Sequence, residues 1–238
     1  MRTAYTVFRN LYNVRKMTMK LVLASGSQRR RELLTMCGYD YEIIVSNADE
    51  TIDESDPENF VRALSFRKAK DVFDRLFAAG RRDFAVIGSD TVVAFQKDGE
   101  TKPVIIGKPK DAEDAVRILS MLSGKTHRVF TGVSVIADIP DENAAAQCSI
   151  RKKAEIQTEC SITEVTFETL SPDEITDYVN SGDPLDKAGS YGIQGPFGMF
   201  VREIRGNYFT VIGMPIPVLY KMLKKIGILP HGFYERIE

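Results

Sequence analysis

Cysteine, histidine and long apolar runs are scarce in this chain of 238 residues. Its three cysteines, none in a CxxC spacing, and its two histidines do not supply the closely spaced ligands of a structural zinc site. An odd number of cysteines favours free thiols in a reducing compartment, so a bound metal is expected to have oxygen ligands. No run of about 18 apolar residues occurs, which predicts no transmembrane helix and no membrane partner.

Excess charge of either sign is also missing. The chain has 32 Lys+Arg against 33 Asp+Glu, which excludes a generally basic nucleic-acid-binding domain and predicts no nucleic-acid partner. Hydrophobic residues at 43% and charged residues at 27% are typical of a globular protein with a substantial core. The length fits one large α/β domain or two small ones.

Acidic residues are absent from the first 20 positions, which contain five basic residues interleaved with aromatic and apolar ones. This composition resembles an organellar transit peptide, but a solvated extension is the favoured interpretation. The segment lacks the apolar centre of a secretory signal. We therefore expect an extension at 1–20, a folded domain at 21–227 and a tail at 228–238, in a cytoplasmic protein for which organellar import is the alternative.

Strand and helix patterns alternate along the chain without a linker, which favours one α/β unit with two lobes. Residues 138–161 show no clear period and are interpreted as a surface loop or hairpin excursion, and 183–198 as an ordered glycine-rich loop. Strands are expected at 20–24, 41–45, 84–88, 92–95, about 127–137, 162–170, 201–204 and 208–212, and helices at 27–38, 57–79, 111–122, 172–181 and 215–226.

The turn that follows the first predicted strand has the composition of a phosphate site. Ser25 and Ser27 flank a glycine, and Arg29 and Arg30 follow in the first helical turn. Free backbone N–H groups, hydroxyls and guanidinium groups there can all donate to phosphate. Arginines at a helix N-terminus oppose the helix dipole unless a polyanion binds. The alternative is a serine cap with an exposed basic turn; the spacing of a Walker A loop is absent.

Asp90 lies inside an apolar β-like run, where a carboxylate is costly to bury unless it is paired or bound to metal. We place it at a strand end, where α/β proteins usually bind ligands. Asp49 and Glu50 follow another strand and could reach the same cleft, making an oxygen site suited to Mg²⁺ or Mn²⁺. The alternatives are a satisfied core aspartate and a solvated acidic turn.

Three further positions could carry chemistry. Lys68 interrupts an apolar helical stripe, so its side chain must either extend to solvent or meet an anion. Lys108 stands between glycine and proline and is either a ligand cation or a surface charge. Gln194, in a glycine-rich stretch, can donate and accept at once and so could pair with a base edge. The alternative for that stretch is an ordered loop without a ligand.

Taken in order, these segments resemble the Maf family, homologues of a septum-formation protein that are nucleoside triphosphate pyrophosphatases. The resemblance covers about 21–227, apart from the 138–161 excursion. One position departs from the family pattern, because Gln28 stands where the family usually has proline. Without proline the entry to the helix is expected to be less rigid. The matching motifs are Leu23–Arg30, Asp49-Glu50, Lys68-Ala69, Gly88–Thr91, Gly107–Pro109, Gly124–His127, Asp186–Gly195, Asn207-Tyr208 and Gly213–Pro215.

The resemblance implies a mixed twisted sheet flanked by helices, with two lobes around a central cleft, similar to the inosine triphosphatases. It also implies a homodimer that converts a nucleoside triphosphate and water to the monophosphate and pyrophosphate. Thr91 and Gln194, with Arg29, match the dTTP- and UTP-specific members, whereas the 7-methyl-GTP branch tends to have glutamine and glutamate in place of Thr91 and Gln194. Enzymes acting on modified nucleotides and a nucleotide-binding regulator of cell division are the alternatives.

Chemistry then suggests a role for each residue. Asp90 is the expected general base, and with Glu50 and Asp49 it is expected to hold a divalent cation. Lys68 and Lys108 are expected to stabilise developing negative charge. The phosphate-binding side chains are expected to be Ser25, Ser27, Arg29 and Arg30.

Overall fold

A computed structural model describes residues 19–96, 99–139 and 154–231. The described residues form a seven-stranded mixed sheet in the order β2-β1-β3-β5-β6-β7, with β4 paired to β3 off this path. β1 is parallel to both of its neighbours, and the other pairs are antiparallel. The strands are β1 Lys20–Leu23, β2 Tyr41–Ile43, β3 Phe84–Phe95, β4 Val104–Ile106, β5 Thr126–Asp138, β6 Glu155–Phe167 and β7 Val201–Arg205.

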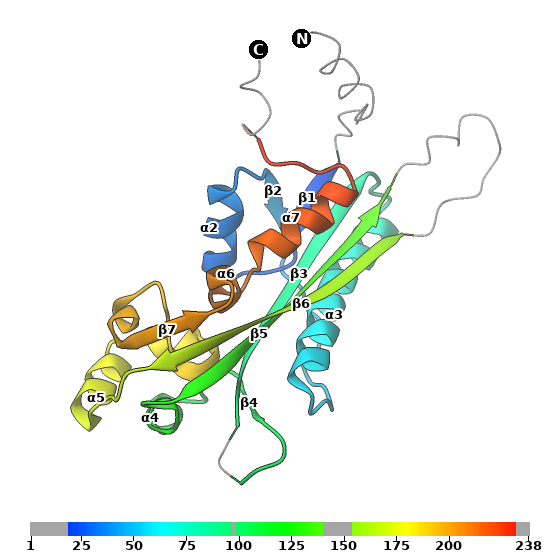
Figure 1. The fold of residues 1–238 in the computed structure, drawn as a ribbon. Coiled ribbons are helices and arrows are strands. Elements are labelled where there is room, and N and C mark those ends of the chain that lie inside the picture. Colours follow the sequence, from blue (N-terminus) through cyan, green and yellow to red (C-terminus); the bar gives the residue numbers. More distant parts are fainter. Residues whose placement is uncertain (1–18, 97–98, 140–153, 232–238) are drawn as a thin grey trace, which may run out of the picture.

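Helices cover both faces of this sheet (Figure 1). The helix α3 lies along β3 and β5 on one face, whereas α2 and α7 cover the other face at one end and α4 and α5 lie at the opposite end. The predicted two-lobed α/β fold is confirmed. The helices are α2 Gln28–Met36, α3 Pro57–Ala78, α4 Ala112–Leu122, α5 Pro172–Asn180, α6 Tyr208–Ile212 and α7 Ile216–Lys225. No helix in the described ranges is long and apolar enough to cross a membrane.

The long strand β3 distributes its side chains between the two layers. Successive residues of a strand point to opposite faces, so Val86 and Val92 pack against α3, whereas Ile87 packs with α2 and α7 and Val93 packs with α4 and α5. By the same alternation, Asp90 is on the α3 face and Thr91 is on the opposite face. The neighbours Asp90 and Thr91 therefore meet different groups.

Three predicted elements differ from the structure. The strands expected at 84–88 and 92–95 are one strand, because the hydroxyl of Ser89 donates to the Gly132 and Gly213 carbonyls and the intervening polar residues are satisfied in place. The strand expected to begin at residue 162 begins at Glu155, so part of the predicted 138–161 excursion pairs with β5. Residues 140–153 of that excursion, and the extension at 1–18, lie outside the described ranges.

The predicted strand at 208–212 is instead the short helix α6. Its aromatic and β-branched residues suit a strand, but both ends carry helix caps. The side chain of Asn207 accepts hydrogen bonds from the backbone N–H groups of Phe209 and Thr210, and Gly213 ends the helix with a positive φ of 109°. The caps therefore outweigh the strand propensity.

A buried histidine at the end of the sheet covered by α4 and α5 makes the stability of the protein depend on pH. His127 is 2% exposed and packs against Phe167 and Tyr191, with its Nε2 atom 3.0 Å from the Tyr191 hydroxyl. Burial lowers the pKa of His127 to about 3. In the unfolded chain the imidazole has its ordinary pKa, so below that value the unfolded state binds the extra proton and the folded state does not.

As the pH falls from about 6 to about 4, we expect His127 to reduce the free energy of unfolding by about 1.4 kcal/mol for each pH unit. Urea unfolding of the wild type and of His127→Gln across this range checks the expectation. The variant should lose less stability on acidification, because it has no imidazole to protonate. Parallel losses in the two proteins would show that His127 does not carry this dependence.

Candidate active site

The site lies where β3 extends beyond the end of β1. β1 pairs with β3 only as far as Leu23 and Ile87, and β4 pairs with β3 again from Val93 onward. Between these points no strand of the described residues pairs with this edge of β3, and a cavity of about 1470 Å³ opens there. The prediction that Asp90 lies at the end of its own strand is therefore wrong. Asp90 lies inside β3, beside the end of the neighbouring parallel strand β1, where ligands of α/β proteins usually bind.

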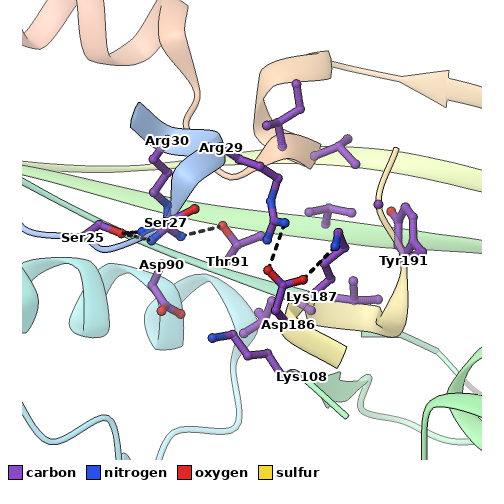
Figure 2. Close-up of a pocket in the computed structure, with 18 of the residues that line it drawn as sticks. Ser25, Ser27, Arg29, Arg30, Asp90, Thr91, Lys108, Asp186, Lys187 and Tyr191 are labelled. Atoms are coloured by element: carbon purple, nitrogen blue, oxygen red, sulfur yellow. Dashed lines mark hydrogen bonds and ion pairs between the residues drawn. The ribbon is translucent and has the colours of Figure 1, made fainter. Parts of the chain in front are cut away.

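Nearly all of the predicted site residues line this one cavity, and Figure 2 shows seven of them around it. They come from the turn after β1, the segment between β2 and α3, the elements α3 and β3, the segment after β4, and the glycine-rich loop before β7. The turn at Ser25–Arg30 and Asp90 therefore face a shared space. The predicted residues lining it are Ser25, Ser27, Arg29, Arg30, Glu50, Lys68, Asp90, Thr91, Lys108 and Gln194.

Lys68 connects two of the carboxylates that line the cavity. Its Nζ atom lies 2.7 Å from Asp90 Oδ1 and 3.0 Å from Glu50 Oε1. The Lys68 and Asp90 side chains are 13% and 11% exposed, whereas Glu50 is 65% exposed. Of the two alternatives for Lys68, the structure shows the one with an anionic partner. The pair therefore places a carboxylate and an ammonium group in direct contact at the cavity wall.

Two glycines bring α3 close enough for this pairing. Gly88 and Gly132 lie on the α3 face of the sheet, and Gly132 is the cross-strand partner of Asp90. A Cβ atom at Gly88 would lie 2.2 Å from the Ser65 carbonyl oxygen, and one at Gly132 would lie 2.2 Å from the Val61 carbonyl oxygen. Any side chain at either position would force the helix away from the strand. The helix that carries Lys68 thus touches the sheet backbone on both sides of Asp90.

Arg30 is held by uncharged groups. Its guanidinium donates to the Gly213 carbonyl at 2.9 Å, to Ser25 Oγ at 3.1 Å and to Thr91 Oγ1 at 3.4 Å. Its pKa lies below the ordinary value, because loss of solvent and the like charge of Arg29 outweigh the attraction of nearby acids. Arg30 therefore brings positive charge to the cavity wall with no ion-pair partner among the described residues, which favours a polyanion.

The N-terminus of α2 offers further donors. Ser27 is the N-cap residue, but its side chain makes no capping hydrogen bond, and the first turn contains no acidic residue. The Ser27 backbone N–H donates to Ser25 Oγ at 3.2 Å. The Gln28 side chain, at the position where proline was expected, donates to Glu32 at 2.8 Å and so stays within its own helix. Hydroxyl and backbone donors thus surround the positive end of the helix dipole.

The predicted three-carboxylate metal set is not brought together. Asp49 is exposed, and its Oδ1 accepts from the Thr51 backbone N–H at 2.9 Å, so this side chain stabilises its own turn and lies outside the cavity lining. Glu50 and Asp90 do meet, on either side of Lys68. In the part of the chain that the structure describes, no group of three or more acidic, histidine or cysteine residues is arranged to hold a metal.

The glycine-rich loop contains a charged network that the residue patterns did not indicate. Arg29 Nη1 lies 3.3 Å from Asp186 Oδ2, and Lys187 pairs with both Asp183 and Asp186 (Figure 2 shows the two Asp186 contacts). Tyr178, on α5, donates to Asp183 at 2.5 Å. A cluster of two acids and a lysine within five positions was visible in the sequence, but no local signal connects Arg29 or Tyr178 to it.

The remaining predicted residues are exposed at the rim of the site. Lys108 and Gln194 both line the cavity with exposed side chains, from the segment after β4 and from the glycine-rich loop. Thr91 is partly exposed, and its Oγ1 lies 3.0 Å from Thr131 Oγ1. The exposed polar groups of Lys108 and Gln194 can reach a ligand that enters the cavity.

Comparison with known proteins places this chain in a family. The sequence profile described as "Maf-like protein" matches residues 20–226. The dTTP/UTP pyrophosphatase of Agathobacter rectalis is 40% identical over 217 residues, covering 88% of this chain and 98% of that protein. The dTTP/UTP pyrophosphatase of Bacillus thuringiensis subsp. konkukian is 43% identical over 210 residues, covering 88% and 96%.

Among solved structures, the Staphylococcus aureus Ham1 protein aligns over 87% of this chain and 98% of its own, with a TM-score of 0.44 and 16% identity. The family assignment rests instead on the profile match and on relatives that are at least 40% identical over nearly their whole length. The chain belongs to the Maf family.

Proposed function

We propose that this protein is a nucleoside triphosphate pyrophosphatase that hydrolyses dTTP and UTP to the monophosphate and pyrophosphate. The observation that carries the proposal is that the paired Asp90 and Lys68 share one cavity with the basic turn at Ser25–Arg30. A general base, a cation and a phosphate-binding helix terminus are the parts that hydrolysis of a phosphoanhydride needs. The relatives of the same family that are named dTTP/UTP pyrophosphatases support the same reaction.

In this mechanism the oxygen of a water molecule attacks the α-phosphorus. The new bond forms between this oxygen and phosphorus, the bond to the bridging oxygen of the β-phosphate breaks, and the proton of the water passes to the Asp90 carboxylate. Ser25, Ser27 and the arginines of the α2 terminus bind the phosphates, because their donors face the same cavity. Lys68, and Lys108 at the rim, stabilise the charge that develops on the phosphates.

Divalent cations are compatible with the donors present. Asp90 and Glu50 offer carboxylate oxygens, the ligands that Mg²⁺ prefers, and Mg²⁺ usually takes only one or two carboxylates beside water and substrate phosphates. These two residues would hold the ion; Asp49, which stabilises its own turn, is the weaker candidate. A bound Mg²⁺ or Mn²⁺ supplies charge neutralisation for the triphosphate and for the pyrophosphate that leaves.

Pyrimidine preference is proposed to depend on Arg29, Thr91 and Gln194. A uracil or thymine edge presents an N–H donor between two carbonyl acceptors, and the Gln194 amide can serve both kinds of group. We expect Gln194→Glu to lower kcat/KM for dTTP and UTP by about 10- to 100-fold, because the carboxylate has no donor and meets a carbonyl oxygen. Steady-state kinetics with dTTP, UTP, GTP and 7-methyl-GTP check this, and an unchanged nucleotide profile would contradict it.

The direct test of the function is pyrophosphate release from a panel of common and modified nucleoside triphosphates, with and without Mg²⁺. We expect release that depends on the metal and is fastest with dTTP and UTP. A preference for modified or 7-methyl-guanine nucleotides would replace the substrate assignment, and binding without hydrolysis would identify a regulator. The expected homodimer and cytoplasmic location stay predictions, which gel filtration with light scattering and cell fractionation check.

A further inference from the structure

The carboxylate of Asp186 is shared between two separate parts of the cavity wall. Its Oδ1 lies 2.7 Å from Lys187 Nζ, within its own loop, and its Oδ2 lies 3.3 Å from Arg29 Nη1, on α2. Burial alone would raise the pKa of Asp186, but the hydrogen bond from Lys187 and the charges of Arg29 and Lys187 hold it below the ordinary value. Asp186 is thus ionised and has a cation on each side (Figure 2).

Lys187 is fully used inside the loop. Its Nζ atom donates to the Asp183 carbonyl, to Asp183 Oδ1 and to Asp186 Oδ1, and the side chain is 12% exposed. An ammonium group has three donors, so none is left for a phosphate. The loop also closes tightly around this side chain, because a Cβ atom at Gly192 would lie 2.6 Å from Lys187 Cε.

Tyr178 joins the two ends of the same loop. Its hydroxyl donates to Asp183 Oδ2 and accepts from the Gly192 backbone N–H at 3.0 Å. The segment from Asp183 to Gly192 is therefore connected by buried or half-buried polar contacts, and Gln194 follows two residues later. These contacts connect Asp186, through Lys187 and Asp183, to the part of the loop that leads to Gln194.

Within this network, the contact between Asp186 and Arg29 is the one that a bound triphosphate can replace. The Asp186 side chain is 67% exposed and that of Arg29 is 29% exposed, so the pair is accessible to solvent and is held weakly. Arg29 lines the cavity beside the phosphate-binding turn. A triphosphate carries more negative charge than one carboxylate and can therefore compete with Asp186 for this guanidinium.

We propose that Asp186 is a positioning residue that couples the phosphate-binding turn to the loop carrying Gln194. This inference rests on the proposed function. Through its ion pair with Arg29, Asp186 restrains this guanidinium and holds the loop against α2. When a triphosphate takes over Arg29, the loop stays ordered through Lys187 and presents Gln194 to the base.

Two effects of opposite sign follow for Asp186→Asn. Sodium tripolyphosphate, which has no base, should bind about two- to fivefold more tightly, because Arg29 loses its anionic competitor. The preference of the site for the α,β-imido analogue of dTTP over that of dGTP should fall by at least about fivefold, because an uncharged side chain pairs more weakly with Lys187 and the loop that carries Gln194 is held less firmly. A variant that was merely misfolded would instead bind tripolyphosphate and both nucleotide analogues more weakly.

Isothermal titration calorimetry on the full-length protein measures both effects without turnover. Asp177→Asn, which removes an exposed acid of α5, controls for net charge, and Asp186→Glu should restore the preference because it keeps the carboxylate. Tighter tripolyphosphate binding together with a lost pyrimidine preference would establish the coupling. Unchanged or weaker tripolyphosphate binding, or a retained preference, would overturn it. Failure of the proposed hydrolysis would appear separately, as absent pyrophosphate release from the wild type.

Discussion

Asp90→Asn is expected to reduce kcat for dTTP hydrolysis by about 10²- to 10⁴-fold, the usual contribution of a positioned general base. Asparagine has the shape of aspartate, and its amide oxygen can still accept the hydrogen bond that Asp90 Oδ1 receives from Lys68 at 2.7 Å. The variant should therefore fold normally and bind nucleotide, but it cannot take a proton from the attacking water. Pyrophosphate release under saturating dTTP measures the loss.

Asp177→Asn is the matched control for this experiment, because it makes the same chemical change at an exposed position on α5. It should leave kcat unchanged. Thermal unfolding of both variants shows whether the loss of activity reflects chemistry or folding. Near-normal turnover in Asp90→Asn would remove Asp90 from the role of base and direct attention to Glu50, the other carboxylate that contacts Lys68 in the cavity.

Lys68→Gln is expected to lower kcat/KM for dTTP by about 10²- to 10³-fold, as removal of one donor to a developing charge typically does. The Nζ atom of Lys68 is within 3.0 Å of both Glu50 and Asp90. Without this cation, two carboxylates and an incoming triphosphate would share one low-dielectric space. Steady-state kinetics check the effect, with Lys70→Gln as the control for loss of a charge from the exposed side of the same helix.

The double variant Lys68→Gln with Asp90→Asn separates two roles of Lys68. If Lys68 acts by holding Asp90, the second substitution adds little to the first, since residues that act as a unit are strongly non-additive. If Lys68 stabilises charge on the phosphates directly, the two losses multiply. Equal activity of Lys68→Gln and the wild type would contradict both roles.

Much of the fold was predictable because the relevant signals are local. The helix that begins at Pro57 has an aspartate cap whose side chain accepts from the Asn59 backbone N–H, and the helix that begins at Pro172 has a complete capping box at Ser171. Apolar periodicity then indicated where most elements run. The wrong strand at 208–212 is instructive, since Asn207 and Gly213 are also local caps, but they enclose only five residues whose composition suits a strand.

The site residues could be chosen from sequence, but their partners could not. Asp90 drew attention because a carboxylate inside an apolar run needs compensation, and Lys68 because it interrupts an apolar stripe. Neither pattern says that the two meet. Their pairing depends on the close approach of α3 to the sheet at Gly88 and Gly132.

The amino-acid sequence by itself determined the α/β class and the basic turn at the start of α2, and it predicted a phosphate site at that turn, because caps, periodicity and donor chemistry are properties of neighbouring residues. Only the tertiary structure decided which charges pair, as in Arg29 with Asp186 across 157 positions and Arg30 with the Gly213 carbonyl across 183. Such contacts depend on strand register and on helix packing. Register and packing depend on which distant segments are buried against each other. The residue pattern of a single segment does not show which distant segment is its partner.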